Sequence, residues 1–184
     1  MNNIQRKGIG KMKIYKKVIA CILTLMMFFA QMPVNVFAAN QKNNIPLDIV
    51  LVLDVSGSMV DPITSTDTTK RITILKDSIN QFIEEFAKNN SKQSDEKYQS
   101  RISIISPAGA TRSDFAMELA LKQINQSKND ESRKDAKRIV FFVTDGQPTT
   151  FNNFDDDVAN GAINTSKEIK KDAEVYTFGM YFLT

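Results

Sequence analysis

The chain has 184 residues, enough for one ordinary domain and too few for two. It carries 24 Lys and Arg against 21 Asp and Glu, with one cysteine and no histidine. The absence of histidine excludes Ser-His-Asp catalysis, Cys-His catalysis and histidine-ligated zinc within this chain.

The first 38 residues have the pattern of a secretory leader. Six lysines and arginines without an acid are followed by an apolar run from Val18 to Phe29, and Val36 to Ala38 supplies small residues for a cleavage site. A membrane anchor is the main alternative, but the run is shorter than the ~18–20 residues that span a bilayer. We therefore predict a signal peptide at residues 1–38 and a secreted or cell-surface mature chain.

Cleavage after Ala38 changes both the charge and the cysteine content. It leaves 18 basic and 21 acidic residues, a net charge of −3, so the mature chain has no basic surplus to attract nucleic acid. It also removes Cys21, the single cysteine, which excludes a disulfide framework. We expect neither nucleic acid nor membrane contact for the mature domain.

After a short linker at residues 39–46, residues 47–184 predict a single domain. Leu47 to Leu53 is a strand buried on both faces, and apolar residues at helical spacing predict a helix from about Lys70 to Lys88. The remaining elements, in order, are a polar loop (Asn89 to Lys97), a strand (Arg101 to Ile105), a helix (Ser113 to Ile124), a charged loop (Asn125 to Lys137), a second apolar strand (Arg138 to Thr144), a helix (Val158 to Lys171) and a last strand (Glu174 to Gly179). Within the charged loop, the stretch from Lys128 to Lys137 is expected to be solvated.

Strands that alternate with helices predict an α/β, Rossmann-like fold, in which helices flank both faces of a mostly parallel sheet. Such sheets bind ligands at the carboxyl ends of their strands. The strand that ends at Leu53 is followed by Asp54, Ser56 and Ser58 in a D-x-S-x-S pattern, and the strand that ends at Thr144 continues into Asp145 and Gly146, a T-D-G sequence. We therefore expect these oxygen groups at one edge of the sheet.

A third contribution to this edge is the G-x-T sequence that ends at Thr111. Thr111 and Ser113 can equally serve as the N-cap of the helix that follows, and the pattern alone leaves both roles open. The acidic run from Asp155 to Asp157 indicates the start of the next helix, with a second cation site as the alternative.

Hydroxyl and carboxylate oxygens, without nitrogen or sulfur, suit a hard divalent cation. The predicted metal ligands are Asp54, Ser56, Ser58, Thr111 and Asp145. Mg²⁺ is the preferred ion, and Mn²⁺ and Ca²⁺ are alternatives.

These three motifs, in this order and on these elements, resemble the metal-ion-dependent adhesion site of von Willebrand factor type A domains, as found in bacterial surface and pilus adhesins. The resemblance spans about Ile45 to Gly179. It implies that Ser56 and Ser58 bind the metal through their hydroxyls and Thr111 directly or through water. It implies that Asp54 and Asp145 act largely through waters and hydrogen bonds.

The resemblance also implies binding rather than turnover, in which an Asp or Glu of a protein partner, such as a host-matrix or surface protein, completes the metal's coordination. Two alternatives remain: a nonfunctional fragment of a larger adhesin, and a metal-dependent hydrolase that uses Asp54. The hydrolase is disfavoured because the aspartyl-phosphate folds place a second aspartate where this chain has Ser56.

One departure from the family lies between the second strand and the G-x-T loop. These domains usually carry an antiparallel edge strand and a helix there, whereas "RISIIS" runs directly into "PAGATR". A final strand and helix are also expected to be missing. We predict an uncovered sheet edge at Arg101 to Ser106.

Overall fold

The computed structural model describes residues 45–107, 111–150 and 153–180, which belong to one compact unit. The predicted signal peptide, nearly all of the linker, and Gly109 and Ala110 of the G-x-T sequence lie outside the described residues. No helix among the residues described is long and apolar enough to cross a membrane.

The centre of the domain is a four-stranded parallel sheet with the order β2-β1-β3-β6. Its strands are β1 (Leu47–Leu53), β2 (Arg101–Ile105), β3 (Lys137–Thr144) and β6 (Glu174–Gly179). Every residue of β1 is buried, as its apolar run from Ile49 to Leu53 predicts for a central strand covered on both faces. The four predicted strands are confirmed, with one residue added at the start of β3.

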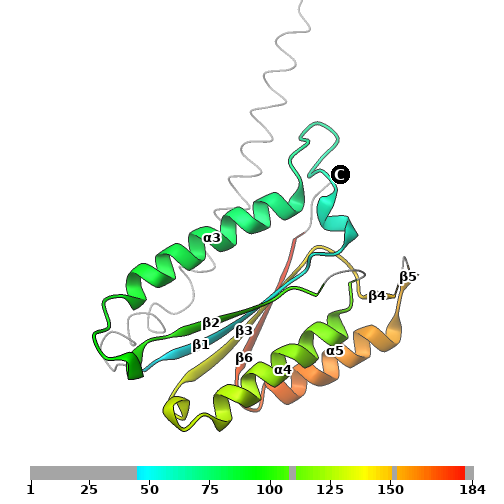
Figure 1. The fold of residues 1–184 in the computed structure, drawn as a ribbon. Coiled ribbons are helices and arrows are strands. Elements are labelled where there is room, and N and C mark those ends of the chain that lie inside the picture. Colours follow the sequence, from blue (N-terminus) through cyan, green and yellow to red (C-terminus); the bar gives the residue numbers. More distant parts are fainter. Residues whose placement is uncertain (1–44, 108–110, 151–152, 181–184) are drawn as a thin grey trace, which may run out of the picture. The chain divides into compact units, whose positions relative to one another are not determined.

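Three helices flank this sheet: α3 (Arg71–Asn90), α4 (Ser113–Asn129) and α5 (Asp156–Ile169). Figure 1 shows α4 and α5 side by side on one face and α3 on the other. Between the sheet and α4 lies a core that includes Val50, Val52, Met117, Ile124 and Val140. The predicted α/β class with helices on both faces is therefore confirmed.

Two helices run further than their apolar pattern predicts, because polar side chains in their last turns have distant partners. At the end of α3, the Asn90 side chain accepts a hydrogen bond from the Ser100 amide (2.7 Å) and donates one to its carbonyl (3.0 Å). In α4, the Ser127 hydroxyl donates to the Asp48 carboxylate, and Lys128 pairs with Asp172 at 2.8 Å. The predicted loop boundaries at Asn89 and Asn125 are thus wrong.

A buried ion pair corrects the prediction that the stretch from Lys128 to Lys137 is a solvated loop. Arg133, in a 3-10 turn at Glu131–Arg133, is 1% exposed and pairs with Asp48 of β1. Its guanidinium also donates to the backbone carbonyls of Gln99 (2.7 Å) and Leu47 (3.2 Å). Because a buried charge needs both a partner and hydrogen bonds, this arginine joins the segment to the amino end of the sheet.

The exposed sheet edge is found where it was predicted. β2 is the outermost strand, two residues follow it before the described segment ends at 107, and the Ile104 side chain is 52% exposed.

Short elements that were not predicted are 3-10 turns at Gly57–Val60 and Glu96–Tyr98, and a hairpin of β4 (Thr149–Thr150) with β5 (Asn153–Phe154).

Candidate metal centre

Asp54 connects the loop after β1 to the end of β3. Its amide donates to the carbonyl of Val143 at 2.9 Å, which continues the pairing of these strands by one residue. One carboxylate oxygen accepts from the amide of Ser56 (2.8 Å) and the other from the hydroxyl of Thr144 (2.6 Å). Asp54 is only 7% exposed, so these bonds hold the D-x-S-x-S and T-D-G motifs together inside the protein.

Two serine hydroxyls lie side by side in the turn that follows. The Ser56 and Ser58 hydroxyl oxygens are 3.1 Å apart, and the Ser58 hydroxyl donates to Asp145 Oδ1 at 2.8 Å. The turn is anchored by Met59, which has no exposed surface and whose amide donates to the carbonyl of Ser56 at 3.0 Å. The loop therefore presents its hydroxyls from a fixed backbone.

The second carboxylate of the centre belongs to Asp145, whose side chain is 0% exposed. Its Oδ2 accepts from Nη1 of Arg71, the first residue of α3, at 2.8 Å. Sequence reasoning missed this arginine. The only signal in the sequence is a weak one: a positive side chain in the first turn of a helix is unfavourable next to the helix dipole, which does not identify its partner.

Thr111 lies just before α4, beside the serine and aspartate side chains of the candidate centre. Its carbonyl accepts from the Thr149 amide (3.1 Å) and its amide donates to the Thr149 hydroxyl (3.3 Å), so it is tied to the loop after β3. A methyl group added at Gly146 would lie 3.6 Å from the Thr111 hydroxyl oxygen and 3.8 Å from that of Ser58. The two hydroxyls thus approach one common point that the glycine leaves open.

The capping alternative fails for both candidate residues. The N-cap position of α4 is Arg112, which makes no side-chain capping bond, and Ser113 is the first helical residue. The buried Ser113 hydroxyl has no hydrogen-bond partner within the described chain. Arg112 instead donates to the carboxylate of Asp114, and this hydrogen bond lowers the pKa of Asp114.

The acidic run starts a helix, as predicted, but α5 begins at Asp156 and ends at Ile169, two residues earlier at each end than the predicted bounds of Val158 and Lys171. Asp155 is its N-cap and accepts hydrogen bonds from the amides of Asp157 (2.9 Å) and Val158 (3.2 Å). Among the residues that the structure describes, no three Asp, Glu, His or Cys side chains form a group that could hold a metal. The Asp155 carboxylate thus serves as a helix cap.

The five predicted ligands have the chemistry that suits a small hard cation, and the oxygens of three of them also have the spacing. All their side-chain donors are oxygens, and neighbouring ligands of an octahedral Mg²⁺ lie about 3 Å apart. The Ser56 to Ser58 and Ser58 to Asp145 oxygen distances are 3.1 and 2.8 Å. The structure thus brings Asp54, Ser56, Ser58 and Asp145 into one hydrogen-bonded cluster and places Thr111 beside it.

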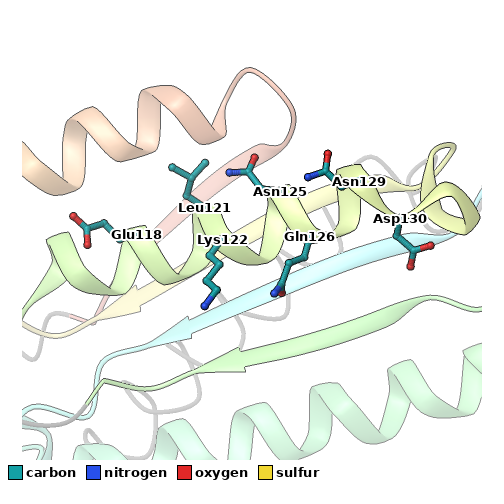
Figure 2. Close-up of a pocket in the computed structure, with 7 residues that line it drawn as sticks. All are labelled: Glu118, Leu121, Lys122, Asn125, Gln126, Asn129 and Asp130. Atoms are coloured by element: carbon teal, nitrogen blue, oxygen red, sulfur yellow. The ribbon is translucent and has the colours of Figure 1, made fainter.

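A cavity elsewhere shares no residue with this centre. It has a volume of about 640 Å³ and lies along α4 and the residue after it, where Glu118, Lys122 and Gln126 are among its lining residues (Figure 2). It is a wide-open hollow on the surface of one helix. The candidate centre is instead built from the ends of two strands, as expected for a parallel sheet.

Comparison with known proteins supports the family suggested by the motifs. Residues 80–182, more than half of the chain, match the von Willebrand factor type A domain. The match includes Thr111 and Asp145 and begins after the D-x-S-x-S motif. No curated protein and no solved structure matches the chain. Domains of this family commonly mediate protein–protein interaction and adhesion and are generally not enzymes. The chain belongs to the von Willebrand factor type A domain family.

Proposed function

We propose that this chain is a secreted or cell-surface adhesion domain that binds a divalent cation, preferably Mg²⁺, and through it an acidic group of a partner protein. The observation that carries the proposal is the cluster of Ser56, Ser58 and Asp145, with oxygen distances of 3.1 and 2.8 Å, at the carboxyl end of the sheet. Such a cluster has the donor type and spacing that Mg²⁺ requires.

Each residue has a distinct role in this proposal. The hydroxyls of Ser56 and Ser58 hold the cation directly, and that of Thr111 holds it directly or through water. Asp54 and Asp145 keep the hydroxyls in place and act on the ion largely through waters and hydrogen bonds. When bound, the cation supplies a coordination position that a partner carboxylate can take. Because hydroxyls are neutral ligands, little of the cation's charge is cancelled and its attraction for a carboxylate stays strong.

The hydrogen bonds of Asp54 favour binding over catalysis. Both of its carboxylate oxygens already accept a hydrogen bond, one from the Ser56 amide and one from the Thr144 hydroxyl. A nucleophilic aspartate would need one oxygen directed at the substrate. Because Asp54 is also only 7% exposed, it is placed to orient the loop rather than to attack a substrate.

The export half of the proposal rests on residues 1–38 and has its own test. If the leader is cleaved after Ala38, N-terminal sequencing of the protein from culture supernatant will begin at Ala39. Full-length chain retained inside the cell would contradict export and leave the metal proposal standing.

The adhesion half is tested by binding the purified chain to a panel of immobilised host-matrix proteins. We expect binding that requires Mg²⁺ or Mn²⁺, is abolished by EDTA and is lost when the contacting Asp or Glu of the ligand is replaced by its amide. Binding that survives both chelation and Ser58→Ala would mean that adhesion uses another surface.

A further inference from the structure

The guanidinium of Arg71 lies at the candidate metal centre. Its Nη1 is 2.8 Å from Asp145 Oδ2 and 3.4 Å from the backbone carbonyl of Ser58. The other oxygen of the same carboxylate accepts from the Ser58 hydroxyl at 2.8 Å. One carboxylate therefore links a fixed positive charge directly to a proposed metal ligand.

We infer that Arg71 sets the metal affinity of this centre: it neutralises Asp145 when no cation is bound and opposes the cation when one is bound. This inference rests on the proposed function, since it concerns the same site. None of the three sequence motifs includes Arg71, which lies at the start of α3, 13 residues after Ser58.

The first half of the inference follows from burial. The Asp145 side chain is 0% exposed and that of Arg71 is 20% exposed. A carboxylate withdrawn from water requires a counter-charge and hydrogen bonds, and here the arginine supplies the only ion pair of Asp145 found in the described chain. Without a cation, the centre therefore depends on Arg71 for its charge balance.

The second half follows from the shared carboxylate. A divalent cation held by the Ser58 hydroxyl would be stabilised by the negative charge of Asp145. That carboxylate already forms an ion pair with Arg71. The guanidinium and the cation are then like charges beside one carboxylate in a partly buried site, where repulsion is stronger than in water. Arg71 thus weakens the metal affinity, and the cation and the arginine compete for Asp145.

The test compares the full chain with Arg71→Gln, which removes the charge and keeps a hydrogen-bonding side chain. Calorimetric titration with Mg²⁺ and with Mn²⁺ is expected to show roughly tenfold tighter binding by the variant, because the opposing charge is gone. Arg101→Gln is the matched control, since it removes an arginine that pairs with Asp130 at the amino end of β2. Its metal affinity should equal that of the wild type.

Thermal unfolding separates this role from a purely structural one. In EDTA, Arg71→Gln should have a lower Tm than the wild type, because Asp145 loses its partner. In saturating Mg²⁺ the difference should shrink, because the cation supplies the missing charge. A structural role alone would lower Tm equally in both conditions.

A second pair of variants avoids an uncompensated buried carboxylate. Asp145→Asn and the double variant Arg71→Gln/Asp145→Asn differ only in the arginine charge, and the double variant should bind Mn²⁺ more tightly. Equal measurable affinities for Mn²⁺ in this pair would overturn the inference.

The outcomes distinguish this inference from the proposed function. If the wild type binds metal and Arg71→Gln binds equally or more weakly, only the inference fails. If neither chain binds metal, both fail. If only Arg71→Gln binds, the arginine blocks the site and the inference holds in its strongest form.

Discussion

The hydroxyl of Thr144 donates a 2.6 Å hydrogen bond to the carboxylate of Asp54, so the last residue of β3 orients the first residue after β1. The two residues are 90 positions apart in the sequence. This bond joins the two motifs from which the centre is built.

Replacing Thr144 with Val tests that bond at nearly constant volume. Since a hydrogen bond to a charged group contributes about 1.5–3 kcal/mol, Thr144→Val should lower the free energy of unfolding by about that amount. Metal affinity should also fall, because Asp54 loses one of its two orienting donors. Urea unfolding and metal titration measure the two effects. Thr177→Val on β6 is the control, and an equal loss in both variants would contradict the assignment.

Gly146→Ala separates the metal centre from the fold. The added methyl group would lie 3.6 Å from the Thr111 hydroxyl and 3.8 Å from that of Ser58, which is ordinary van der Waals contact. We therefore expect stability to stay within about 0.5 kcal/mol of the wild type. Metal affinity should fall several-fold, because the methyl group occupies space between two proposed ligands.

Gly57→Ala is the control for that variant, since a methyl group there meets nothing within 4 Å. Wild-type metal affinity in Gly146→Ala would mean that the cation does not lie between Thr111 and Ser58.

All four sheet strands could be predicted from the sequence because each is a short local pattern of apolar residues, and two of the three motifs directly follow such a strand. The roles of Arg71 and Arg133 could not. Each pairs with a carboxylate far away in the sequence, Asp145 at a separation of 74 and Asp48 at 85. The spacing of apolar residues indicates which face of a helix or strand is buried. It does not identify ion-pair partners that are far away in the sequence.

The ends of α3 and α4 were missed for the same reason. Asn90 and Ser127 are polar, so they do not continue the apolar stripe, yet their hydrogen bonds to Ser100 and Asp48 hold the last helical turns. Tertiary contacts thus extend both helices beyond the point where propensity and pattern stop.

Arg133→Met tests the buried pair at the amino end of the sheet. Removing one partner leaves the Asp48 carboxylate buried without its counter-charge, which should cost about 3–5 kcal/mol of stability. Urea unfolding measures the loss. The exposed neighbour Lys134→Met should change stability by less than about 0.5 kcal/mol. Equal stability of the two variants would show that the Arg133–Asp48 ion pair does not stabilise the fold.

The N-cap of α5 predicts a dependence on pH. Hydrogen bonds from the Thr150 hydroxyl, and then from the amide of Val158, lower the pKa of Asp155 below its ordinary value of 3.8. A lowered pKa in the folded state means that Asp155 contributes stability above about pH 4, and that this contribution is lost as pH falls through the folded-state value.

The matching variant is Asp155→Asn. It should be less stable than the wild type at neutral pH, and the difference should shrink as the pH is lowered below 3.8. Thermal unfolding across this range measures it, with Asp156→Asn, which keeps the capping carboxylate, as the control. A difference that stays constant with pH would contradict a role for the ionised carboxylate.

The central claim is that Ser56, Ser58, Thr111 and the two aspartates bind a divalent cation, and calorimetric titration of Mg²⁺ and Mn²⁺ tests it most directly. We predict one site per wild-type chain, at least tenfold weaker binding by Ser58→Ala, and circular dichroism spectra that coincide. Ser103→Ala, which removes a hydroxyl from β2 that bonds to Gln123 at 3.3 Å, should bind like the wild type. A folded wild-type chain and a folded Arg71→Gln chain that both give no heat with either ion would contradict the claim, as would full affinity in Ser58→Ala.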